Sequence, residues 1–348
     1  PCWNDNYSYR RRDAYRSRWN KEERWPPWPP CLIFEVEKMD VQIVDGWPKG
    51  NEIRLLMTNT DAAQVNAIRR ALIADVPKLA IDRVNFDQGT HQDNKGQVLE
   101  SVNVLPDEVI AHRLAMIPVP TYPDEGITFP DDCPTCKDMA EESKGCMTCQ
   151  VLYHIRKEGP SEDSEEAFKT VYAEDLTTIS DQMFDIREEH KRIPLTILSK
   201  GQYLEFYAFA TLGRGRDHAK WSPVAAVGFR QHQIATLNKP KKAKVLFDLG
   251  LTTTDGKPID AKLFGKDKKM TDINHLLDLT DALHQVGPGT NRDGDFDDAI
   301  TMEPVEGAYI FNYETDGSLT PEQAFNGAMK ELQGRFDRLA SEIDQALA

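Results

Sequence analysis

Four of the six cysteines form two short knuckles, which are Cys133-Pro-Thr-Cys136 and Cys146-Met-Thr-Cys149. Each knuckle places two thiolates on one tight turn, and the segment between the knuckles is long enough to fold one onto the other. The pattern predicts one tetrahedral zinc ion per chain. An iron–sulfur cluster, a redox pair and plain buried thiols are the alternatives that the spacing leaves open. Because four thiolates leave no open coordination position, a zinc ion here would be structural.

The common catalytic motifs are missing from the sequence. It contains no P-loop, no G-x-S-x-G, no H-E-x-x-H and no magnesium-binding aspartate triad. The stretch Gly213-Arg214-Gly215-Arg216 resembles a phosphate-binding loop, but a turn with solvated arginines has the same composition. A metal-dependent hydrolase is therefore the weakest functional interpretation.

The composition indicates a globular protein with more than one domain. The chain has 348 residues, of which 40% are hydrophobic, and a net charge of −15. This charge argues against a free-standing nucleic-acid binder, because phosphate neutralisation needs a basic surface. No stretch is apolar enough to span a bilayer and no signal peptide is evident, so we expect no membrane association and a soluble, intracellular protein.

One predicted helix, residues 61 to 76, carries cations where apolar side chains are expected. Asp61 is its N-cap. Arg69 falls inside the apolar stripe, and Asn66 and Arg70 lie on its flank. A guanidinium in such a place needs a carboxylate or carbonyl oxygens as partners.

A second predicted helix, residues 107 to 117, repeats this feature with Arg113 inside its stripe. Two such helices suggest faces that another chain completes. An ion pair within the chain, with Asp82 or Asp107 as the acceptor, is the alternative interpretation.

Several short segments predict strands. They include a hairpin before the first helix, a strand just after the second knuckle, and later strands at 193 to 198, 203 to 212 and 309 to 311. Residues 1 to 31 form a Trp- and Pro-rich extension. We expect residues 233 to 304 to be irregular apart from a helical stretch around 273 to 284.

The chain ends in a predicted amphipathic helix that Thr320 caps, with Pro321 at its first position. Large apolar residues recur along it at alternating spacings of four and three. The residues of this seam are Phe325, Met329, Leu332, Phe336, Leu339 and Ile343. The seam could cover the protein's own sheet, but its 3.5-residue repeat favours a partner helix.

Taken together, several phrases of the sequence resemble the assembly-platform subunit of multisubunit DNA-dependent RNA polymerases. This family comprises the archaeal D-type assembly protein, the third-largest subunit of eukaryotic RNA polymerase II and the bacterial alpha N-terminal domain. The sequence that follows Leu212 resembles the archaeal D-type members more than the eukaryotic subunit. The phrases are Asn66-Ala-Ile-Arg-Arg70, Val76-Pro-Lys-Leu-Ala-Ile-Asp82, Asp107-Glu-Val-Ile-Ala-His-Arg-Leu114, the cysteine knuckles, Gly213-Arg-Gly-Arg-Asp-His-Ala-Lys-Trp-Ser-Pro223 and Glu314-Thr-Asp-Gly-Ser-Leu319.

The resemblance implies an α+β fold with a split alpha-like dimerisation domain, a mixed sheet and a long C-terminal helix. The dimerisation domain would comprise residues 32–84, 194–232 and 305–348. An inserted β-rich domain with the zinc-binding loop would comprise residues 85–193. No iron–sulfur cluster is expected in residues 232–305, which lack cysteine.

The resemblance also implies a non-catalytic scaffold. It would form a heterodimer with a smaller alpha-like subunit, dock the two large catalytic subunits and other small subunits, and meet DNA only through the complex. The expected location is the cytoplasm for an archaeal-type protein and the nucleus for a eukaryotic one. Besides the helix seam, the interface candidates are Asn66, Arg69, Arg70, His112, Arg113, Arg214, Arg216, His218, Lys220 and Trp221. The alternative is a zinc-dependent, nucleic-acid-binding regulator that uses the cysteine lobe, Arg214 and Arg216.

Overall fold

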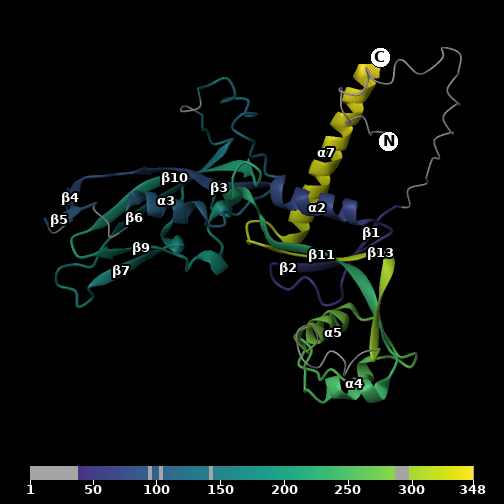
Figure 1. Ribbon diagram of the computed structural model, residues 1–348. Helices are drawn as coiled ribbons and strands as arrows, with labels where there is room; N and C mark the ends of the chain where they lie inside the picture. Colours follow the sequence, from purple (N-terminus) through teal and green to yellow (C-terminus); the bar gives the residue numbers. More distant parts are fainter. Residues whose placement is uncertain (1–37, 93–95, 102–104, 141–143, 287–297, 348) are drawn as a thin grey trace, which may run out of the picture. The chain divides into compact units, whose positions relative to one another are not determined.

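The structure is a computed structural model that describes residues 38–347 apart from 93–95, 102–104, 141–143 and 287–297 (Figure 1). The Trp- and Pro-rich extension therefore lies outside the described residues. The described strands and helices confirm an α+β fold.

A five-stranded sheet and two helices enclose one hydrophobic core. The strand order is β1-β2-β13-β11-β12, and every pair is antiparallel. Helix α2 packs against α7, and both contribute to the core with β2, β11 and β13. The bounds are β1 Asp40–Ile43, β2 Glu52–Thr58, α2 Ala62–Ala74, β11 Val224–Leu237, β12 Lys269–Met270, β13 Ile300–Thr315 and α7 Pro321–Leu347.

A second core lies around a four-stranded sheet of order β3-β10-β6-β8, joined by the β7–β9 pair and α3. A short β4–β5 hairpin stands beside it. The bounds are β3 Pro77–Phe86, β4 Thr90–Gln92, β5 Val98–Glu100, α3 Asp107–Ala115, β6 Gln150–Glu158, β7 Phe168–Tyr172, β8 Thr177–Thr178, β9 Pro194–Ser199 and β10 Tyr203–Arg214.

The strand pairing departs from two expectations. Strands β9 and β10 fall in the expected dimerisation domain, but they pair with β7, β3 and β6 and contribute to the second core. The expected mixed sheet is antiparallel in both main sheets, although most neighbouring strands are not consecutive in the chain.

The expected helical stretch around 273 to 284 is confirmed as helix α5 (Ile273–Val286). The other described residues of 233–304 are more regular than expected, because they include helix α4 (Pro240–Phe247) and contribute to a third core. Strands β11 and β13 also extend into this segment from either side. Lysines occupy the first turns of α4, so its sequence gives little sign of an apolar face. Ala243 and Leu246 form that face and are buried.

The two predicted N-caps, Asp61 and Thr320, are confirmed. The Asp61 carboxylate accepts a hydrogen bond from the Gln64 N–H at 2.8 Å. At the start of α7, the Thr320 hydroxyl accepts from the Gln323 N–H at 3.2 Å, while the Gln323 side chain accepts from the Thr320 N–H at 3.0 Å. This reciprocal capping box fixes where α7 begins.

Candidate metal centre and subunit interfaces

The two knuckles bring the four predicted cysteines together. Their Sγ atoms all lie within 4.8 Å of one another. The Sγ–Sγ distances are 3.6 Å for Cys133–Cys146, 3.8 Å for Cys146–Cys149 and 3.9 Å for Cys149–Cys136. Four sulfurs about 2.3 Å from a tetrahedral zinc ion would be about 3.8 Å apart, so the cluster has the size of a zinc site.

Backbone turns build this cluster locally. In the first knuckle the Cys136 and Lys137 N–H groups donate to the Cys133 carbonyl, and in the second the Cys149 and Gln150 N–H groups donate to that of Cys146. Strand β6 begins at Gln150, directly after the last cysteine, and so ties the second knuckle to the sheet of the second core.

The thiols of the second knuckle differ in acidity. A hydrogen bond from the Thr148 backbone lowers the pKa of Cys146 to about 6, whereas burial raises the pKa of Cys149 to about 12. A cation at the centre would favour the thiolate form of all four cysteines. The donor set fits a soft metal ion without an open position.

The cations of α2 have no carboxylate partner in the described part of the chain. Arg69 is half-buried, and its Nε donates to the Asn66 side-chain oxygen at 3.0 Å. Arg70 is exposed. The alternative of an ion pair with Asp82 or Asp107 does not hold, because Lys220 binds the first at 2.5 Å and Gln88 donates to the second.

Arg113 lies at the edge of the apolar stripe of α3 rather than inside it. It is exposed, and its Nη1 donates to the Leu195 carbonyl at 2.9 Å. Ile110 and Leu114 form the buried face of α3, while His112 is exposed. A carbonyl partner thus explains Arg113 without another chain.

The glycines of the Gly213–Trp221 segment allow it to pack closely against neighbouring groups. A Cβ at Gly213 would collide with the Trp221 ring, and one at Gly215 would collide with the Ile73 carbonyl. The Trp221 indole N–H donates to the Thr211 carbonyl at 3.0 Å. The two glycines are therefore explained by close approach and not by a phosphate ligand.

Arg214 differs from the expectation of an interface residue, because its side chain is only 21% exposed and bonds within the chain. Its Nη2 lies 2.9 Å from a Glu331 carboxylate oxygen on α7, and its Nε donates to the Asp75 carbonyl at 3.1 Å. The guanidinium also stacks on the Phe129 ring, with 4.4 Å from Cζ to the centroid. Arg216 remains half-exposed, 4.0 Å from the buried Asp75 carboxylate.

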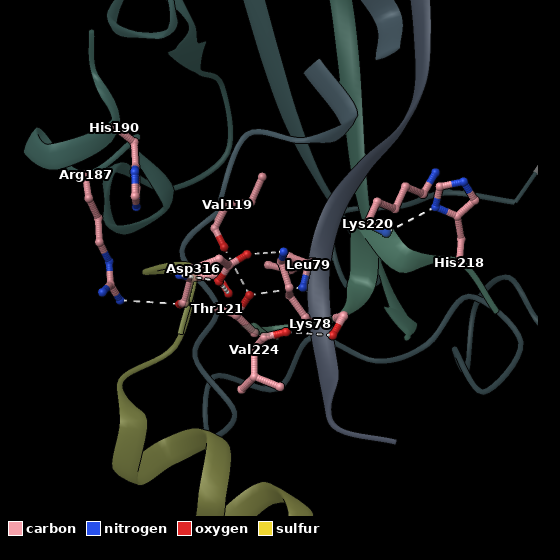
Figure 2. Close-up of polar contacts among 12 residues, drawn as sticks. Lys78, Leu79, Val119, Thr121, Arg187, His190, His218, Lys220, Val224 and Asp316 are labelled. Carbon is pink, nitrogen blue, oxygen red and sulfur yellow. Dashed lines mark hydrogen bonds and ion pairs between the residues drawn. The ribbon is translucent and has the colours of Figure 1, made fainter. Parts of the chain in front are cut away.

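Two further ion pairs were not predicted. The buried Asp75 carboxylate accepts from Arg335 of α7, and the buried Lys78 ammonium pairs with Asp316. Figure 2 shows Lys78, Thr121 and Asp316 converging from three segments. Thr121 Oγ1 accepts from the Leu79 N–H at 3.0 Å and donates to the Val119 carbonyl at 3.1 Å. This junction links the start of β3 to the loop before α7.

One groove is lined by residues from three of the recognised phrases, and His112, His218 and Lys220 among them are interface candidates. It lies between α3, β3 and the turn after β10, and it encloses about 550 Å³. The Asp82–Lys220 ion pair lies in its wall, and Met116 at its rim is 67% exposed. The groove is lined by Ile81, Asp82, Val84, Ala111, His112, Ala115, Met116, His218 and Lys220.

The seam of α7 divides into a covered and an uncovered part. Phe325 and Leu332 are half-buried against the first core. Phe336, Leu339 and Ile343 are 66%, 51% and 42% exposed. No described helix is long and apolar enough to cross a membrane.

The chain is similar over most of its length to RNA polymerase subunits. The RNA polymerase Rpb3/Rpb11 dimerisation domain matches residues 54–336. The DNA-directed RNA polymerase subunit Rpo3 of Picrophilus torridus is 31% identical over 85% of this chain and 97% of its own length. Rpo3 of Thermococcus kodakarensis is 30% identical over 84% and 94%. Subunit 3 of the DNA-directed RNA polymerases II, IV and V of Arabidopsis thaliana is 26% identical over 86% and 90%. The chain therefore belongs to the RNA polymerase Rpb3/Rpb11 dimerisation family.

Proposed function

We propose that this chain is a non-catalytic assembly subunit of a DNA-dependent RNA polymerase. Its uncovered α7 seam would pair with a smaller alpha-like subunit, and the heterodimer would dock the two large catalytic subunits. The observation that carries the proposal is the row of large apolar side chains on the second half of α7, which this chain leaves in solvent. We expect such a subunit in the cytoplasm of an archaeal-type cell or in the nucleus of a eukaryotic cell.

One structural zinc ion would hold the cysteine lobe. Cys133, Cys136, Cys146 and Cys149 would be its ligands, and the ion would offset the repulsion among the four thiolates. Arg214 connects the lobe to α7, because it contacts Phe129 near the first knuckle and Glu331 on α7. A fixed lobe would therefore support the position of α7.

The structure favours the scaffold over a nucleic-acid-binding regulator. That alternative required Arg214 and Arg216 to face a phosphate backbone. Arg214 instead bonds to Glu331 and to the Asp75 carbonyl, and Arg216 lies near the Asp75 carboxylate. Phosphate binding would have to break these contacts.

Glutamate at two seam positions tests the dimer interface. We expect Phe336→Glu combined with Leu339→Glu to weaken pairing with the alpha-like subunit at least about 100-fold, because two charges would be desolvated in an apolar seam. The measurement is the fraction of heterodimer in native mass spectra across a dilution series. The matched control is Ser341→Glu with Gln345→Glu, which adds the same charge on exposed positions of the opposite helix face. Equal loss in both variants would argue against the seam as the interface.

The α3–β3 groove is the candidate docking site for a large catalytic subunit. We expect Met116→Glu to leave the heterodimer intact and to reduce co-purification of the two largest polymerase subunits at least about tenfold, since it places a charge on an apolar rim. Val98→Glu is the control, because Val98 is also exposed but lies on β5, outside the groove. If the Met116→Glu protein co-purifies normally with the two largest subunits, the groove is not part of the docking surface.

A further inference from the structure

Two lysine-rich segments around the third core take no part in the proposed subunit interfaces. Residues 238–247 contain four lysines and no acidic residue, and residues 266–269 read Lys-Asp-Lys-Lys. All of these lysines are exposed. The whole chain has a net charge of −15, so the two segments are locally opposite in sign to the protein that carries them.

The fold brings the two segments together. Strand β12 includes Lys269, which pairs with Thr236 of β11. The Leu237 N–H donates to the Lys268 carbonyl at 2.9 Å. Helix α4 begins at Pro240, only a few residues further along the chain. Lysines that are far apart in the sequence therefore lie near one another beside the third core.

Helix stability does not account for the lysines of α4. The start of a helix carries a partial positive charge, which favours acidic residues there and disfavours cations. Helix α4 has no acidic residue in its first turn and no side chain that caps it. Asp298 pairs with Lys239 at 3.3 Å. Among the described residues, no such ion pair reaches Lys241, Lys244 or Lys269. An anionic ligand would offset the repulsion that remains.

We propose that the lysine patch binds the phosphate backbone of duplex DNA. The patch consists of Lys241, Lys242, Lys244, Lys266, Lys268 and Lys269. Cations of this kind supply nearly all of the affinity in sequence-independent DNA binding, because each contacted phosphate releases condensed counterions. This inference goes beyond the proposed function, in which the chain itself needs no contact with nucleic acid.

The chemistry of the patch favours duplex DNA over other anions. Proteins that hold single strands stack the bases on exposed aromatic side chains. The aromatic residues that adjoin the two segments, Phe247 and Phe264, instead pack into the third core. Duplex DNA presents one negative charge per about 1.7 Å, so an eight-residue helix of roughly 12 Å faces about seven charges. An extended acidic polypeptide offers at most one charge per about 3.3 Å.

Removal of three positive charges tests the patch. We expect Lys241→Gln combined with Lys244→Gln and Lys269→Gln to weaken binding of the full chain to a duplex of about 20 base pairs at least about 50-fold in roughly 100 mM salt. The dependence of log Kd on log salt concentration should fall by about three, since each lost phosphate contact removes about one unit of slope. Fluorescence anisotropy across a salt series measures both quantities.

The matched control removes the same charge elsewhere. Lys38→Gln combined with Lys169→Gln and Lys330→Gln changes three exposed lysines outside the patch. We expect this variant to keep most of the affinity and the salt slope of the unmodified chain. Equal losses in the two variants would overturn the inference, because overall charge would then explain the binding. An unmodified chain that does not bind the duplex would overturn it as well.

Further probes test the ligand and the site. We expect two duplexes of unrelated sequence to bind equally, because the patch contacts phosphates and not bases. Chelation of metal should leave binding unchanged, since residues 232–305 lack cysteine. Loss of binding on chelation would refute the patch, because it would assign the contact to the cysteine lobe. Polyglutamate or single-stranded DNA of equal charge that competes better than the duplex would refute duplex DNA as the occupant.

Discussion

Removing the metal from the four-cysteine site is expected to unfold the cysteine lobe and leave the two main cores folded. A structural zinc site contributes on the order of 10 kcal/mol to folding, and the cysteines here form a separate small cluster without a large apolar core around them. Chelation should therefore abolish amide protection in residues 128–140 and 144–149, while β3, β6 and β10 keep theirs. Hydrogen exchange with and without chelator measures both regions in one experiment.

Cys149→Ser should have the same effect as chelation, with metal content falling well below one ion per chain. Met147→Leu is the control, because Met147 lies in the same knuckle but is 65% exposed and is not a ligand. A Cys149→Ser protein that retains one zinc ion and a protected lobe would contradict the four-cysteine site.

Breaking the Lys78–Asp316 pair is expected to cause the largest loss of stability among single substitutions in the junction of Figure 2. Asp316→Asn leaves the ammonium of Lys78, a side chain only 5% exposed, without its counter-charge. We expect it to cost about 4 kcal/mol, since removal of one partner of a buried ion pair typically costs 3–5 kcal/mol. Lys78→Met should cost less, because Asp316 is partly exposed and keeps two hydrogen bonds from Ser318.

The double variant isolates the interaction between the two charges from the other contacts of each residue. Lys78→Met combined with Asp316→Asn should be more stable than the sum of the single changes implies, because no uncompensated charge remains buried. Urea unfolding of the four proteins gives the coupling free energy. Additive effects would show that the two charges do not stabilise each other.

Local chemistry explains what could be predicted from the sequence. The knuckles, the Asp61 cap and the Thr320 capping box each lie within a few residues of chain, so their spacing alone specifies them. The seam of α7 is likewise readable from its repeat. The exposure of its second half agrees with the preference for a partner helix over the protein's own sheet.

Contacts between distant segments could not be predicted in the same way. Arg214 meets Glu331 across 117 positions, and Lys78 meets Asp316 across 238, with no periodicity to pair them. Lys220, an interface candidate, also pairs with Asp82 of another recognised phrase. Several of the phrases that characterise the family therefore bind one another within this chain.

Weak patterns explain the remaining differences. Only Tyr309 to Phe311 predicted a strand near the end of the chain, whereas β13 begins at Ile300 and includes Pro304 and Gly307. Both residues normally argue against a strand interior. The hairpin was predicted, but the exposure of Val41 and Ile43 depends on how far α2 and α7 extend over the sheet, which no local pattern states.

The most direct test of the scaffold is co-expression with a candidate alpha-like small subunit, followed by native mass spectrometry and metal analysis. We expect a 1:1 complex that carries one zinc ion on this chain and dissociates when Phe336 and Leu339 are replaced by glutamate. A stable monomer that does not pair, and that binds DNA or RNA in a metal- and salt-dependent manner, would contradict it.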